Sequence, residues 1–391
     1  MGRRALIWLA VAVAMGSAFG VGFELRAHSL RPPSPGAATA SGPLRAQVLA
    51  ELAGHYYENV PARATQAHTV NGVLAALGDP YTEYLAPAAY RDLLESQAGG
   101  YAGVGLALAR GPNGLIVRAS LPGLPAWKAG IRPGDVITAV DDRNLAGVPY
   151  GSAVGLIHGA SGTPVHLLIQ RPGQHVPVLL TLVREPVRLT RVTSERMGEG
   201  AASVVVIRIP AFSEGTAADV RRIVTAAVAR PTAGIVLDLR GDLGGLLSEA
   251  IGVARVFINQ GVIVNTGGAH ERSDTLVADG TAVRGVPRLA ILIDGTTASA
   301  AELVAGSLRH DLAGRGAMVV GARSFGKGTI QAIHPLPNGG ALKLTVAVFR
   351  LAGGVPVGGR GIRPDVAAPD RPQTDVDETL QAALQLIAPP A

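Results

Sequence analysis

The sequence contains no cysteine and few charged, aromatic or lysine residues. The lack of cysteine excludes disulfide bonds, thiol nucleophiles and thiolate-bound zinc, although it leaves the redox compartment open. Charged residues are 16% and aromatic residues 4% of the 391 residues, and the net charge of +6 forms no basic stripe. We therefore expect no nucleic-acid partner. Only three of the 35 basic residues are lysines, so each is worth testing for a role that arginine cannot fill: they are Lys128, Lys327 and Lys343.

The amino end has the pattern of a targeting segment. Arg3 and Arg4 precede an apolar run, Ala5–Phe23, which is typical of a secretory signal peptide and is also long enough for a membrane anchor. We expect this segment to span 1–25 and to be followed by a linker at 26–43 that is rich in Pro, Ser, Ala and Gly. The segment predicts an extracytoplasmic protein, either secreted or attached to a membrane.

Residues 44–97 show helical spacing of apolar side chains. Gly78-Asp79-Pro80 ends one of these helices, and a short helix is expected near Pro87–Ser96. No pair of residues here has catalytic spacing. The pattern favours a helical packing or dimerisation element, and self-association is therefore an expectation.

Short strand-like runs between Gly/Pro turns predict a separate β-rich unit at 98–185. Its segment Ala126–Ile137 resembles the signature of PDZ domains, and the loop Tyr101–Leu106 resembles their carboxylate-binding loop. Gly103 and Gly105 would let the backbone N–H groups around Val104 and Leu106 converge on an anion. An extended peptide could then add to the following strand. The alternative is a small β domain that only spaces its neighbours.

After Pro186 the pattern changes to alternating strands and helices, which predicts an α/β core at 186–370 and a helical tail at 371–391. The expected strands are Ser203–Ile209, Ile235–Leu239, Leu289–Asp294 and Ala317–Gly321, and the expected helices are Ala217–Ala229, Leu246–Phe257 and Ala300–Leu312. The last strand–helix–strand unit should hold two parallel strands, whose carboxyl ends meet at the ligand-binding edge. Ser299 follows the first of these strands and Lys327 the second.

Several readings compete for this edge. Ser299 and Glu302 fit a capping box, which alone predicts only a well-formed helix start. Gly321–Lys327 matches seven positions of a phosphate-binding loop. However, Gly328 stands where that loop has a metal-binding Ser or Thr, and prolines follow too soon for the helix that the loop requires. No serine-protease elbow motif accompanies the histidines. These observations disfavour a nucleotide hydrolase and a histidine triad.

A serine–lysine pair remains. A serine nucleophile needs a base, and a buried lysine can be neutral near neutral pH whereas an arginine cannot. Gln331 lies four residues after Lys327 and would share its face in a helical turn, where it could orient the amine. Gly244-Gly245 precede a helix, so their N–H groups could hold an anion or a developing oxyanion.

Five motifs and the order of the segments resemble the carboxyl-terminal processing proteases, also called tail-specific serine proteases. The motifs are Gly78–Leu85, Asp238–Arg240 with Gly244–Leu247, Thr297–Glu302, Ser324–Gln331 and Gly361–Asp365, and the likeness spans Leu44–Val366. Two departures stand out. Asp242-Leu243 replaces a pair that is usually Asn-Pro, and the Ser-to-Lys interval is about three residues longer than usual, within Leu312–Gly316.

The resemblance implies a multidomain α/β protein with a helical amino-terminal segment, a PDZ domain and a crotonase-like peptidase core. It implies Ser299 as nucleophile, Lys327 as general base and Gln331 as its partner. It also implies an oxyanion hole from the Ala300 N–H and a glycine of the Gly244-Gly245 pair.

We expect a serine endopeptidase that cuts proteins near free carboxyl termini and needs no metal or cofactor. The alternative from another class is a PDZ scaffold with an inactive protease core, which the retention of Ser299, Lys327 and Gln331 disfavours. A PDZ-bearing trypsin-like protease lacks its Gly-Asn-Ser-Gly-Gly motif.

Overall fold

The computed structural model describes residues 41–97, 100–111, 113–148, 150–174, 176–188, 191–370 and 376–388. The predicted targeting segment at 1–25 and the linker up to residue 40 lie outside the described residues. Within the described residues, no helix is long and apolar enough to cross a membrane. The chain forms two compact units, one of Ala88–Thr190 and one of residues 41–87 together with Arg191–Ala391.

The first unit is built on an antiparallel sheet with the order β3-β4-β5-β7-β8. Its strands are β3 (Leu106–Gly111), β4 (Gly114–Ser120), β5 (Val136–Val140), β6 (Arg143–Asn144, beside β5), β7 (Pro164–Gln170) and β8 (Val178–Val183). Two helices, α6 (Pro125–Lys128) and α7 (Tyr150–Ile157), share the apolar core of this sheet. A separate ribbon pairs β2 (Gly100–Gly103) with β9 (Glu185–Arg188). Strand β3 is the terminal strand of its sheet, so one of its edges is unpaired.

The second unit contains a six-stranded sheet with the order β10-β11-β12-β15-β16-β19, parallel except for β10. Its strands are β10 (Thr193–Met197), β11 (Val204–Arg208), β12 (Gly234–Asp238), β15 (Arg288–Ile293), β16 (Met318–Gly321) and β19 (Val366–Ala367). The helices are α8 (Thr216–Val228), α9 (Leu247–Phe257), α10 (Ala300–Leu312) and α11 (Glu378–Ile387). These positions confirm the α/β fold class expected from the sequence.

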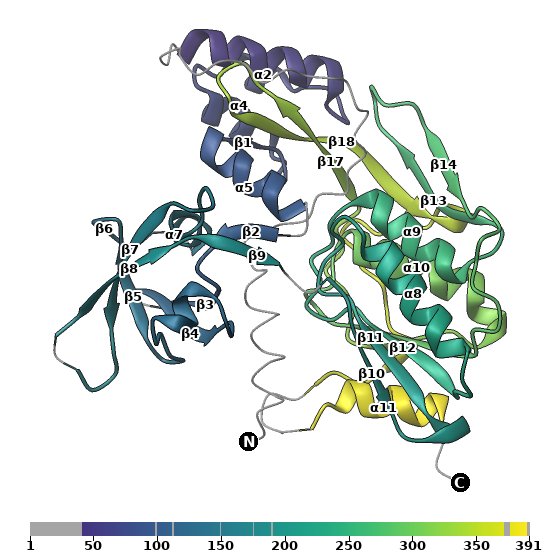
Figure 1. Ribbon diagram of the computed structural model, residues 1–391. Helices are drawn as coiled ribbons and strands as arrows, with labels where there is room; N and C mark the ends of the chain where they lie inside the picture. Colours follow the sequence, from purple (N-terminus) through teal and green to yellow (C-terminus); the bar gives the residue numbers. More distant parts are fainter. Residues whose placement is uncertain are drawn as a thin grey trace. The chain divides into compact units, whose positions relative to one another are not determined.

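Alternation along the strands explains the layers of this sheet. Successive side chains of a strand point to opposite faces. Ile235 and Leu237 therefore belong to the core shared with α8, α9 and α10, whereas Val236 belongs to the cluster formed with α11. Figure 1 shows α11 separated from the other three helices by the strands.

A second sheet in the same unit has β18 (Ala341–Leu351) at its centre. It also contains β1 (Glu83–Leu85), β13 (Val262–Gly267), β14 (Asp274–Val277) and β17 (Thr329–Pro335). The amino-terminal helices α2 (Ser41–His55), α3 (Ala62–Gln66) and α4 (Val70–Leu77) lie beside this sheet in Figure 1 and bury apolar residues in the main core. Helix α5 (Pro87–Gln97) begins at the boundary between the two units and belongs to the first unit from Ala88 onward.

The strand–helix–strand unit that the sequence predicted around Ser299 is present. Strands β15 and β16 pair in parallel, from Ala290 opposite Met318 to Ile293 opposite Gly321. The lysine motif, however, is not helical. Gln331 lies on β17, which pairs with β18, so the expectation of a shared helical face with Lys327 was wrong. The β-branched residues of this segment favour a strand, and long-range pairing with β18 completes it.

Candidate active site

Ser299 occupies a strained turn between β15 and α10. Its backbone has φ +55° and ψ −116°, and it is one of three described non-glycine residues with positive φ. Such a conformation costs on the order of 1–3 kcal/mol and persists only where surrounding contacts impose it. The side chain is 2% exposed. Ser299 is thus held at the amino end of α10 in a strained backbone conformation. A residue that only capped the helix would not need this conformation.

Glu302 supplies the contacts that hold this turn. Its carboxylate is fully buried and accepts hydrogen bonds from Ser299 N–H (2.8 Å), Lys327 N–H (2.8 Å), Gly326 N–H (2.7 Å) and the Ser324 hydroxyl. One oxygen, Oε2, accepts from both Ser299 and Lys327. Burial raises the pKa of the Glu302 carboxyl, and the four hydrogen bonds act against that rise. The carboxylate thus joins the nucleophile and lysine loops through their backbones.

Lys327 lies in a largely buried pocket, with 6% of its surface exposed. Its Nζ atom is 4.8 Å from the centre of the Tyr81 ring. Burial, followed by the positive charge of Lys343, lowers the pKa of Lys327 to about 8 against the opposing effect of Asp79, Glu83 and Glu302. A lysine with this pKa is about one-tenth neutral at pH 7 and can accept a proton.

The glycine loop lies directly against the nucleophile. A Cβ atom added at Gly244, which has φ +105°, would come 2.9 Å from Ser299 Cβ and 3.0 Å from Ala300 N. The structure therefore brings together Ser299, Ala300 and Gly244, which the resemblance implied as nucleophile and oxyanion-hole residues. The two glycines differ in one respect. Gly244 N–H donates to Asp242 Oδ1 at 2.7 Å, whereas Gly245 N–H has no partner among the described residues.

Asp242 stands behind this loop and is completely buried. Its carbonyl oxygen accepts from Ala298 N–H, directly before the nucleophile. Its Oδ2 atom has no hydrogen-bond partner within the described part of the chain. Burial raises the pKa of Asp242 well above its ordinary value, and Asp294 adds to the rise, while the Gly244 N–H bond and Arg208 oppose it. Burial therefore favours the protonated form of this carboxyl compared with an exposed aspartate.

Gln331 is also fully buried, on the strand that leaves the lysine loop. Its amide nitrogen donates to the hydroxyls of Thr329 (2.9 Å) and Thr345 (3.3 Å). Its Oε1 atom has no partner among the described residues. A buried acceptor without a donor is costly, so this oxygen is available to a donor that moves into reach.

In the first unit, the loop of Gly103, Val104, Gly105 and Leu106 joins β2 to β3. Gly105 has φ +77°, and a Cβ atom there would meet the side chain of Leu124 at 2.5 Å, so only glycine fits. Val104 and Leu106 point into the core. The positive φ of Gly105 thus turns the backbone directly before β3, the terminal strand of its sheet.

Sequence reasoning missed several residues that shape the lysine pocket. Tyr81 and Asp79 belong to a segment without catalytic spacing, and the sequence marks Lys343 only as one of three lysines. Its pattern predicts only a helix cap for Glu302, although this residue also holds the lysine loop. The separation of these residues along the chain hides their proximity, and only the rarity of lysine gave a usable signal for Lys343.

Comparisons with known proteins agree with this arrangement. Residues 203–368 match the model of peptidase family S41, and residues 116–171 match a PDZ domain model. The chain is 34% identical over 307 residues to a carboxy-terminal-processing protease of Bartonella bacilliformis, which covers 76% of this chain and 68% of the relative. It is 33% identical over 326 residues to a carboxyl-terminal-processing protease of a Picosynechococcus species, covering 81% and 78% respectively.

Among solved structures, the chain resembles the photosystem II D1 C-terminal processing protease. The TM-score is 0.59 at 28% identity, and the likeness covers 90% of this chain and 99% of the other. Identity of this extent to the curated relatives, together with the two domain matches, confirms the family that the motifs indicated. The chain belongs to the carboxyl-terminal processing proteases, serine peptidases of family S41, and carries a PDZ domain.

Proposed function

We propose that the protein is an endopeptidase that cleaves protein tails by a serine–lysine mechanism. The observation that carries the proposal is the Glu302 carboxylate, because one of its oxygens accepts a hydrogen bond from both Ser299 N–H and Lys327 N–H. Such a shared anchor fixes the nucleophile and a partly neutral lysine in one site. A scaffold with an inactive core would have no need for a strained serine or a buried lysine.

In the proposed reaction, the neutral Lys327 amine takes the proton of the Ser299 hydroxyl as Oγ attacks the scissile carbonyl carbon. The negative oxygen that forms is held by the N–H groups of Ala300 and Gly245, since Gly244 N–H is engaged by Asp242. Collapse of this intermediate breaks the C–N bond, and the Lys327 ammonium gives its proton to the leaving amine. Water then enters, again deprotonated by Lys327, and releases the acyl group from Ser299.

Gln331 is proposed to orient the Lys327 amine. Its unpartnered Oε1 is the group that would accept a hydrogen bond from the amine, and its amide nitrogen is fixed by Thr329 and Thr345. This arrangement would limit the rotamers of the lysine during proton transfer.

Substrate tails are proposed to bind at the first unit. The loop of Gly103–Leu106 would hold a free carboxylate with its backbone N–H groups, and the peptide would pair with the open edge of β3. We propose the domain limits given above, an extracytoplasmic location directed by residues 1–25, and self-association through the helical region at 44–97.

The first prediction concerns the base. Ser299→Ala should lower turnover by roughly 10⁴-fold or more with the fold intact. Lys327→Arg should be nearly as inactive, because a guanidinium keeps the charge but cannot accept a proton. In the unaltered enzyme kcat/KM should rise with pH around an apparent pKa of about 8, because deprotonation creates the base.

Peptide hydrolysis followed by mass spectrometry checks these expectations, with circular dichroism as the test of folding. Lys128→Arg, at an exposed ion pair with Glu185, is the control and should keep full activity. Near-normal turnover in Lys327→Arg would require another base.

The second prediction concerns the tail. Two peptides that differ only in a free or an amidated carboxyl terminus should be cut at different rates, because amidation removes the charge that the Gly103–Leu106 N–H groups would meet. The amidated peptide should show a raised KM and little change in kcat. Equal rates for the two peptides would contradict carboxylate recognition while leaving the serine–lysine chemistry intact.

The third prediction concerns Asp242. Asp242→Asn keeps an acceptor for Gly244 N–H and is always neutral, so activity at pH 7 should change by less than about tenfold. As pH rises through the raised pKa of Asp242, ionisation would bury a charge behind the glycine loop, so activity should fall over that pH range in the unaltered enzyme but not in Asp242→Asn.

The matched variant Asp242→Leu removes the acceptor for Gly244 N–H and should lose kcat at every pH. If activity falls identically with rising pH in the unaltered enzyme and in Asp242→Asn, ionisation of Asp242 is excluded as the cause of the fall.

A further inference from the structure

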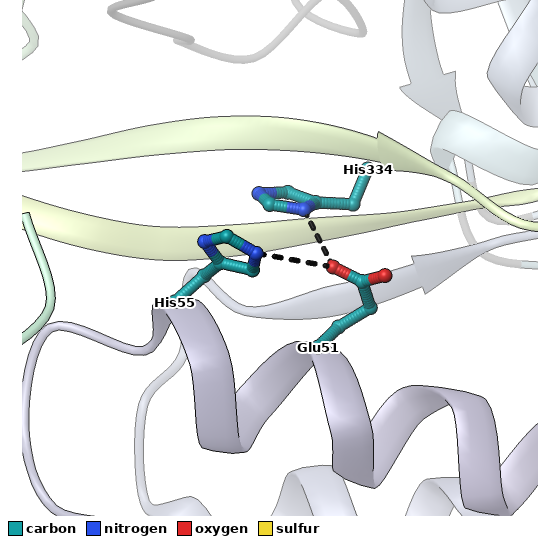
Figure 2. A group of neighbouring side chains, drawn as sticks. All are labelled: Glu51, His55 and His334. Atoms are coloured by element: carbon teal, nitrogen blue, oxygen red, sulfur yellow. Dashed lines mark hydrogen bonds and ion pairs between the residues drawn. The ribbon is translucent and has the colours of Figure 1, made fainter.

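A cluster of three side chains joins the amino-terminal helix α2 to strand β17. Glu51 and His55 lie one turn apart on α2, and His334 faces them from β17 (Figure 2). His334 Nδ1 is 2.7 Å from Glu51 Oε2, and His55 Nε2 is 3.8 Å from the same oxygen. One donor atom from each residue lies within 4.8 Å of the others. The cluster shares no residue with the proposed catalytic site.

We propose that Glu51, His55 and His334 bind a divalent transition metal, with Zn²⁺ the best fit. Two imidazoles and one carboxylate are a frequent zinc-binding set, whereas Ca²⁺ and Mg²⁺ prefer oxygen ligands. Tetrahedral zinc with bonds of about 2.1 Å places neighbouring donor atoms about 3.4 Å apart. The separations of 2.7 and 3.8 Å bracket that distance, so small side-chain shifts form the site.

The geometry of the two rings permits ligation. The proton on Nδ1 of His334 would move to Nε2 when Nδ1 binds the metal. The rings of His55 and His334 lie 4.7 Å apart and tilted by 46°, so both can turn a nitrogen toward Glu51. Partial exposure of all three side chains leaves a path for the ion.

Three protein ligands leave one position, which water can fill. The metal would act as a clamp between two segments that are 283 positions apart in the chain. His334 stands on the same strand as Gln331. Binding would therefore fix α2 against the strand that carries a proposed catalytic partner, and it would stabilise the folded state increasingly as the free metal concentration rises above the dissociation constant.

The test uses the full chain, stripped with a chelator and titrated with ZnCl₂ by calorimetry and with CoCl₂ by visible absorption. We expect one equivalent to bind, a tetrahedral Co²⁺ spectrum without thiolate bands, and a melting temperature about 5 °C higher at saturation. His55→Gln and His334→Gln should each weaken binding by at least about tenfold. Glu51→Gln should also weaken binding. Because the new amide can still accept a hydrogen bond from His334, this variant tests metal binding even if the histidine variants fail to fold.

His310→Gln is the matched control, since it removes a half-exposed histidine of α10 outside the cluster. It should leave affinity and spectrum unchanged. The proposal is overturned if no equivalent binds, or if the cluster variants bind as tightly as His310→Gln. In either case the cluster is a hydrogen-bonded contact between α2 and β17 alone.

Discussion

The active site depends on a single buried carboxylate. Glu302 accepts four hydrogen bonds from two loops that follow different strands, and these bonds set where the backbones of Ser299 and Lys327 lie. A buried carboxylate without partners would be costly, so the loops must close around it for the fold to be stable. The same closure imposes the positive φ of Ser299. The same hydrogen bonds therefore satisfy the buried carboxylate and hold the backbones of Ser299 and Lys327 in place.

The parallel sheet provides the frame for this carboxylate. Strands β15 and β16 end side by side, and their following loops meet at one edge. Strand β12 ends beside β15, which brings the glycine loop to the same place. The second sheet contributes the environment of the lysine, because Tyr81 precedes β1 and Lys343 lies on β18. Burial there, with a neighbouring positive charge, lowers the pKa of the Lys327 ammonium to about 8.

The local sequence pattern predicted much of the fold around Ser299. The apolar runs and their spacing located the strands and helices around Ser299, and the topology rule for parallel strands placed Ser299 and Lys327 at one edge. The helical turn expected from Lys327 to Gln331 is absent, because pairing with β18 decides the conformation of Gln331 and its neighbours. Which glycine of the pair is free could not be foreseen either, since it depends on where the Asp242 side chain turns.

The long-range electrostatic effects could not be predicted from the sequence either, because they also depend on contacts between distant segments. The pKa of Lys327 depends on Lys343, Asp79 and Glu83, which approach it only after both sheets form. The raised pKa of Asp242 depends on complete burial, which a polar residue in a glycine turn does not suggest. The sequence was sufficient to propose the reacting groups, whereas the effects on their pKa values required the fold.

The central claim, that Lys327 is a base tuned by its surroundings, can be measured directly. The chain has only three lysines, so incorporation of lysine labelled with ¹³C at Cε gives three NMR signals, which Lys128→Arg and Lys343→Arg assign. The account predicts that the Lys327 signal titrates with a midpoint near pH 8. A Lys327 signal that does not titrate until pH approaches the ordinary lysine value of about 10.4 would contradict it.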